Sequence, residues 1–74
     1  MIVRVYKGSV ILRNITSNKG GFNSTSIVLY RYNFCKFKSI RLNMDIDENQ
    51  TVKSVREVEN NIIDKLNTLL KNEK

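Results

Sequence analysis

Aromatic and basic side chains alternate along residues 28–38, the stretch of this sequence best suited to chemistry. Aromatic rings stack on unpaired bases, and ammonium groups contact phosphates. In an extended chain every second side chain points to the same face. One face would then carry Val28, Tyr30, Tyr32, Phe34, Lys36 and Lys38. The pattern predicts a nucleic-acid-binding surface. The alternative is that the rings cover a sheet and the lysines are solvated, and a turn at Asn33 would divide this face between two strands.

Charge is distributed unevenly along the chain. The 74 residues carry a formal net charge of +6. Residues 1–44 contain eight basic side chains and no carboxylate, whereas residues 45–74 contain five basic and seven acidic ones. A surface of one sign attracts polyanions and accelerates their association. The acid-free part therefore favours nucleic acid as the partner, with an acidic protein as the alternative.

Catalytic chemistry has few candidates in this composition. The sequence contains no His, and Cys35 is its only cysteine. Without histidine, neither the usual cysteine–base pair nor the usual tetrahedral zinc site can form within one chain. We therefore expect no enzymatic activity, no catalytic residue, no metal and no cofactor. We expect Cys35 to be a small core thiol.

The acidic segment at residues 45–49 begins like a calcium-binding loop. However, Gln50 stands where the loop requires a glycine, and Arg56 stands where it requires a bidentate glutamate. A calcium site is therefore not expected. Negative charge at the start of a helix is favourable and accounts for these carboxylates.

The first part of the chain has the composition of β-strands, because it is rich in Val, Ile, Thr, Tyr and Phe. Turn-forming residues divide it at Lys7–Ser9, at Asn18–Gly21 and at Asn33. The apolar phase changes near Ser39, which predicts a bulge there. The predicted strands cover residues 3–6, 9–16, 26–32 and 34–44.

Apolar residues recur with helical spacing after residue 50. We predict a helix over residues 50–72, with Thr51 or a capping box of Ser54 and Glu57 at its start. The simplest assembly is an α+β fold, a small antiparallel sheet of three to four strands with one C-terminal amphipathic helix packed on one face. It would form a single domain over residues 1–74, with a basic sheet region at about 1–44. The apolar stripe consists of Val52, Val55, Val58, Ile62, Leu66 and Leu69.

A sheet with one helix leaves its second face uncovered. We expect that face to be polar, functional or covered by a second copy. The helix offers another seam for self-association or for a partner, through Ile63, Leu66 and Leu70. A homodimer is therefore one of the expected states.

In its order of elements, the chain over about residues 9–72 resembles the small DNA-binding domains of phage and transposon integrases. Those domains lay a basic three-stranded sheet into the DNA major groove, so the resemblance implies DNA binding through the sheet. It assigns no role to individual residues. No apolar run is long enough to span a membrane, and the N-terminus lacks a secretory signal. The expected setting is therefore intracellular and cytoplasmic.

The leading hypothesis is a small non-enzymatic nucleic-acid-binding module, with DNA and RNA both open as ligands. Its basic side chains would contact phosphates and its tyrosines would stack or hydrogen-bond. The alternative is a protein-interaction module of phage or mobile-element type. Such a module would inhibit or dock on an acidic or nucleic-acid-processing protein, through its sheet or a sheet edge. The predicted nucleic-acid-binding residues are Arg13, Lys19, Tyr30, Arg31, Tyr32, Lys36, Lys38 and Arg41.

Overall fold

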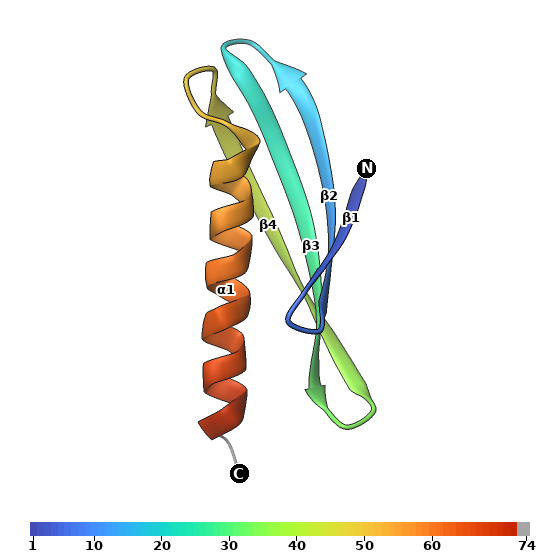
Figure 1. The fold of residues 1–74 in the computed structure, drawn as a ribbon. Helices are drawn as coiled ribbons and strands as arrows, with labels where there is room; N and C mark the ends of the chain where they lie inside the picture. Colours follow the sequence, from blue (N-terminus) through green and yellow to red (C-terminus); the bar gives the residue numbers. More distant parts are fainter. Residues whose placement is uncertain (73–74) are drawn as a thin grey trace.

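The computed structural model describes residues 1–72 as a four-stranded antiparallel sheet with one C-terminal helix (Figure 1). The strands pair in chain order, so a hairpin joins each strand to the next. The predicted α+β fold is confirmed. The elements are β1 (Ile2–Tyr6), β2 (Ser9–Asn18), β3 (Gly21–Asn33), β4 (Lys36–Asp47) and α1 (Val52–Asn72).

Short turns close the three hairpins. Lys7 and Gly8 connect β1 to β2, both with positive φ (47° and 81°), which matches the twist of the strands they join. Gly20 has a φ of 87° in the turn between β2 and β3. Phe34 and Cys35 form the turn between β3 and β4, one residue later than predicted. The turn signals in the sequence therefore located all three hairpins to within about one residue.

Gly21 marks a close approach between β3 and β4. A Cβ atom at this position would clash with the carbonyl oxygen of Ile46. A glycine is therefore needed for the two strands to pair here. The backbone N–H of Glu48 also donates a hydrogen bond to the carbonyl of Gly20 (3.2 Å), which ties the β4–α1 connection to the same end of the sheet.

The structure corrects two details of the predicted strands. β3 begins at Gly21 rather than near residue 26, because its polar first half pairs with β2 on one side and β4 on the other. The predicted bulge near Ser39 is wrong, since the register shift lies in β3 between Arg31 and Asn33. β4 instead carries apolar side chains on both faces. In the sequence this pattern looks like a change of the apolar phase, and it was therefore interpreted as a bulge.

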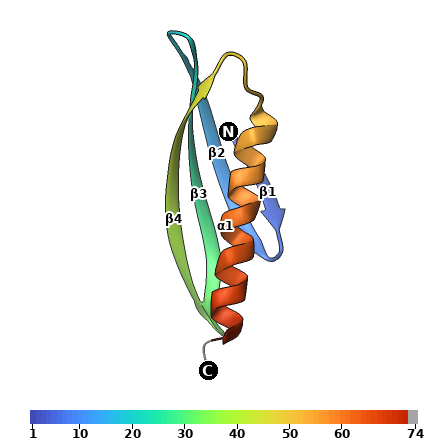
Figure 2. The ribbon, with the colours of Figure 1, turned by 90° about the vertical axis from the view of Figure 1, so that its left-hand side faces the viewer.

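Helix α1 lies along one face of the sheet, as the edge-on view shows (Figure 2). We call this the covered face and the opposite one the uncovered face. Among residues 1–72 no second layer lies on the uncovered face. The predicted packing of the helix on its own sheet is confirmed. The buried apolar side chains of the core are Ile11, Val28, Ile46, Val55 and Ile63.

The helix begins at Val52, two residues later than predicted. The backbone N–H of Ser54 donates a hydrogen bond to the carbonyl of Thr51 (3.0 Å), which closes the first turn. Ser54 and Glu57 lie inside the helix rather than at its cap, so the predicted capping box is wrong. The molecule is elongated, with extents of 46 × 19 × 15 Å. Its two ends are therefore well separated.

Candidate nucleic-acid interface

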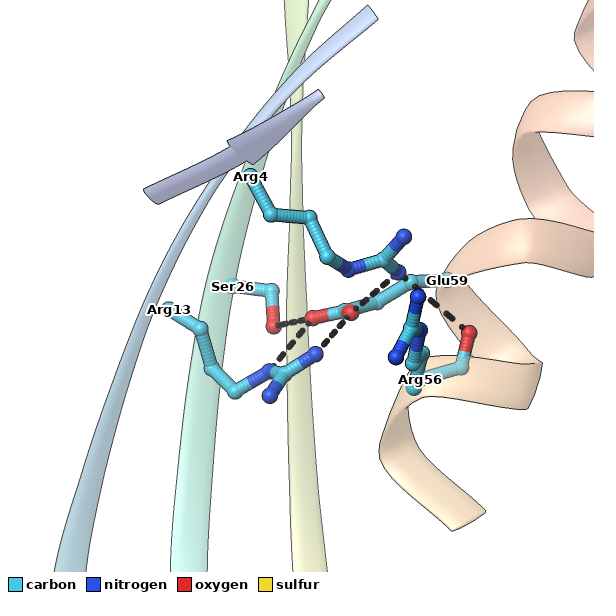
Figure 3. A network of polar contacts seen from close by, with 5 residues as sticks. All are labelled: Arg4, Arg13, Ser26, Arg56 and Glu59. Atoms are coloured by element: carbon cyan, nitrogen blue, oxygen red, sulfur yellow. Dashed lines mark hydrogen bonds and ion pairs between the residues drawn. The ribbon is translucent and has the colours of Figure 1, made fainter. Parts of the chain in front are cut away.

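A buried polar cluster joins α1 to the first three strands around Glu59 (Figure 3). Arg4 donates a hydrogen bond to Oε1 of this carboxylate from Nη2 (2.9 Å). Arg13 binds both oxygens, from Nη2 to Oε1 and from Nε to Oε2 (3.0 Å). The hydroxyl of Ser26 donates to Oε2. Two positive charges and a hydroxyl therefore hold one carboxylate that solvent does not reach.

The ionisation of Glu59 depends on these donors. Burial raises the pKa of its carboxyl group, but the hydrogen bonds from Arg13, Ser26 and Arg4 outweigh burial and hold the pKa below its ordinary value. The hydrogen bond to Glu59 raises the pKa of Arg13 in turn. The pair is thus charged on both sides at neutral pH, and it attaches the middle of the helix to the sheet.

This cluster changes the role predicted for Arg13. Its residue exposure is 4%, and its guanidinium group is bound to Glu59. Arg13 is not free to contact a phosphate, so the expectation that it extends a binding surface is wrong. The sequence contained a signal for this cluster: Glu59 lies four residues after Val55 and four before Ile63, in the middle of the buried stripe of the helix.

Five of the other predicted residues gather on the β3–β4 hairpin. Tyr30 pairs with Lys38 across the two strands, so their side chains share the covered face beyond its packed centre. The Nζ atom of Lys38 lies 4.5 Å from the centroid of the Tyr32 ring. We call these residues the hairpin surface: Tyr30, Arg31, Tyr32, Lys36 and Lys38.

Exposed phenylalanines extend the hairpin surface, although they were not predicted as site residues. Phe34 in the turn is 85% exposed, and Phe37 on β4 is 57% exposed. Arg31 pairs with Phe37 across the strands, and its Cζ atom lies 5.2 Å from the centroid of that ring. Phe34 belongs to the alternating set that identified the stretch in the sequence, whereas Phe37 lies in the opposite phase, on the side of Arg31.

A shallow hollow lies at the same end of the molecule, between the hairpins and the C-terminal part of α1. Its lining includes Lys7, Arg31, Asp64 and Lys71. Nζ of Lys7 lies 2.7 Å from Oδ1 of Asp64. That hydrogen bond lowers the pKa of Asp64, so the carboxylate neutralises Lys7. Within the described chain, no ion pair involves Arg31 or the two hairpin lysines.

The two remaining predicted cations lie elsewhere. Lys19 is exposed in the β2–β3 turn, at the other end of the molecule (Figure 1). Arg41 pairs with Ile27, and alternation along β4 places it on the uncovered face, opposite to Lys38. The eight predicted residues therefore do not form one surface. Tyr30, Tyr32, Lys36 and Lys38 share one side of the hairpin and Arg31 lies on its other side, whereas Arg13, Lys19 and Arg41 are farther away.

Comparison with protein-family models, with curated proteins and with solved structures finds no match to this chain. A functional assignment therefore depends on the geometry of the chain itself. Within residues 1–72, no helix combines the length and apolar character needed to cross a membrane. Over the same range, no three His, Cys, Asp or Glu side chains gather in a way that could hold a metal ion.

The structure also bears on the predicted helix seam and on the cysteine. Ile63 is fully buried against the sheet, so it cannot contribute to a seam between molecules. Leu66 and Leu70 are partly buried, and the most exposed leucine of the helix is Leu69, at 64%. Cys35 is exposed in the β3–β4 turn. The expectation of a core thiol is therefore wrong.

Proposed function

We propose that this chain is a non-enzymatic nucleic-acid-binding module that contacts its ligand through the hairpin surface. The observation that carries the proposal is the cross-strand pairing of Tyr30 with Lys38 beside Arg31 and Tyr32. Rings and cations of this kind bind the bases and the phosphates of one strand together. The neighbouring Lys36 adds a further exposed cation.

Unpaired strands are the preferred ligand in this proposal. Phe34 and Phe37 expose most of their surface at the hairpin, and an exposed ring gains little from a duplex whose bases are already stacked. A single strand offers base faces to such rings at about 1–3 kcal/mol per stacked base. The cations at the hairpin then neutralise phosphates and release counterions, so affinity falls with salt.

The test is a fluorescence-polarisation titration with labelled single-stranded and double-stranded DNA and RNA. With about three phosphates contacted, single-strand affinity falls roughly 20-fold between about 50 and 200 mM salt. The double variant Lys36→Glu/Lys38→Glu removes two contacts, so affinity drops at least about tenfold at low salt and the salt slope falls to roughly a third. Circular dichroism checks that the variant retains its fold, since both lysines are exposed.

A matched control distinguishes the effect of where the charges lie from the effect of the net charge of the protein. Lys53 and Arg56 are exposed on the first turns of α1, and Lys53→Glu/Arg56→Glu changes the net charge by the same amount. We expect this variant to retain affinity within about threefold, with the residual loss due to the weaker long-range field. Equal losses in the two double variants would show that binding follows net charge, and the hairpin surface would then have no special role.

A second candidate function rests on β4, one of the two edges of the sheet. β4 is an edge strand of 12 residues, and an extended segment of another protein can add to such an edge. Lys38 and Arg41 on this strand would favour an acidic partner. This is the interaction module of phage or mobile-element type, inhibiting or docking on a nucleic-acid-processing protein. It predicts a stoichiometric protein complex that forms after nuclease treatment and survives Lys36→Glu.

A further inference from the structure

The uncovered face carries a continuous apolar patch across its first three strands. Strand pairing aligns these side chains in two neighbouring rows that run from β1 through β2 to β3. Alternation places both rows on the side away from the helix, because Arg4, Ile11 and Val28 between them point toward it. The six side chains are Val3, Leu12 and Ile27 in one row and Val5, Val10 and Leu29 in the next.

This patch is comparable in content to the core of the molecule. Six aliphatic side chains lie in it, against five buried apolar ones between the sheet and the helix. Val3 and Val5 are 58% and 67% exposed. Within β1–β3 neither row contains a charged residue. An exposed apolar surface with a polar rim is typical of an interface between proteins.

The rest of the uncovered face is mainly polar and forms the rim of the patch, with Arg41 directly beside Ile27 and with Asp45 and Asp47 farther along β4. Asn23 donates hydrogen bonds to Asn43 (3.1 Å) and to Asp45 (2.9 Å), and Asn43 donates to Thr25 (3.1 Å). These amides already have partners within one chain, so they tolerate contact with another surface. A covering layer therefore has to supply apolar side chains at the centre and leave the Arg41 guanidinium group hydrated or paired at the β4 edge.

Charge along the strands limits how a second copy can lie on this face. The β3–β4 turn is flanked by Arg31 and Lys36, whereas Asp45 and Asp47 lie at the other end of β4. A two-fold axis that crosses the strands places each basic end over the acidic end of the other copy. An axis parallel to the strands places like charges over each other. Opposite charges across an interface favour the first arrangement.

We propose that a second copy of this chain covers the uncovered face, in a two-fold dimer whose axis crosses the strands near Arg4, Ile11 and Val28. The patch packs on itself, as a two-fold interface requires. From strand spacing and rise, the face measures about 600 Å² per chain, which reaches the lower end of stable interfaces. The dimer has four layers, with one helix on each outer side.

This dimer leaves the tyrosines and lysines of the nucleic-acid proposal accessible, whereas Arg31 and Phe37 lie on the uncovered face, beyond the end of the apolar patch. Tyr30 and Lys38 lie on the covered face, away from the second copy. The two hairpin surfaces lie at opposite ends of the dimer. The association rests on the apolar patch and its orientation on the charges along the strands, so failure of nucleic-acid binding does not decide whether the dimer forms.

Sedimentation velocity over about a hundredfold range of concentration tests the association, since a dimer dissociates on dilution. Val5→Glu introduces a charge at a position that is 67% exposed in the single chain, so folding is retained and dimerisation weakens at least about tenfold. Leu69→Glu is the matched control, at a 64% exposed position on the helix, and it leaves the dimer unchanged. A wild-type chain that is monomeric throughout overturns the proposal, as does a Val5→Glu variant that dimerises normally or a Leu69→Glu variant that does not.

Cross-linking tests the direction of the axis. In a Cys35→Ser background, Ser39→Cys places one thiol per chain on the uncovered face of β4. With the axis across the strands, the two thiol-bearing residues lie about 12 Å apart, whereas an axis along β2 separates them by about 22 Å. A bismaleimide that spans the shorter distance should link the dimer efficiently. A dimer that is sensitive to Val5→Glu but is not linked would overturn the crossed orientation.

Discussion

Arg4 and Arg13 on β1 and β2 share the buried carboxylate of Glu59, whereas the cations of the β3–β4 hairpin lie at the surface beyond the packed core. Both groups come from the same acid-free part of the chain. They differ in whether a carboxylate of the helix reaches them. Glu59 lies over the centre of the covered face, whereas the hairpin extends beyond that centre. A count of positive charges therefore overestimates the charge available to a ligand.

The largest expected effect follows from removing the shared carboxylate. Glu59→Gln leaves the buried Arg13 and the partly buried Arg4 without a counter-charge, and breaking a buried pair in this way costs about 3–5 kcal/mol. This is a large part of the stability of a domain of this size. Urea unfolding followed by circular dichroism measures the loss.

The exposed Glu57 on the same helix provides the control. Glu57→Gln should change the unfolding free energy by no more than about 0.5 kcal/mol. If Glu59→Gln proved equally mild, the buried cluster would not be a structural element, and the contrast between the two groups of cations would disappear.

A smaller effect of the same origin appears with pH. Because the pKa of Glu59 is lowered in the folded state, its contribution to stability is complete above the ordinary value of 4.5 and is lost as the pH falls through the folded-state pKa. Urea midpoints should therefore decrease in acid for the wild-type chain. The Glu59→Gln variant should show a flatter profile over the same range. Parallel profiles would mean that other carboxylates control acid stability.

The smallest expected effect concerns the ion pair at the surface. Lys7 and Asp64 are both about half exposed, so water screens their attraction and competes for their hydrogen bond. Asp64→Asn should leave the urea midpoint unchanged within error, although the pKa of Lys7 loses the carboxylate that raises it. A clear loss of stability would show that this surface pair contributes as the buried Glu59 cluster does, and the contrast between surface and buried charges would not hold.

Much of the fold followed from local patterns. Turn residues located the hairpins, and the change from strand composition to helical spacing located α1. The grouping of Tyr30 with Lys38 was also predicted, but by a different route. The pattern suggested alternate positions on one strand, whereas the two residues pair across neighbouring strands. The antiparallel return preserved the face because Tyr30 and Lys38 occupy opposite positions in the register.

The errors share a physical cause. Arg13 and Glu59 are 46 positions apart, and neither residue alone shows that they will meet. Cys35 was expected in the core because no histidine base could make it a nucleophile, but it lies in a hairpin turn that nothing in the described chain covers. The apolar character of the uncovered face was present in the sequence as valine, isoleucine and leucine in both phases. The sequence did not show which of the two phases would stay exposed, although a single helix can cover only one of them.

The structure of this protein thus depends on local preferences of the chain and on contacts between distant residues. Backbone preferences and side-chain alternation act over a few residues, so strands, turns and the helix can be predicted from the residues next to each other. Burial depends on which surfaces come together, and α1 can pack against only one side of the sheet. That choice buries Arg13, leaves the hairpin cations at the surface and exposes the aliphatic rows of β1–β3. Contacts between residues far apart in the chain determine which side of the sheet the helix covers.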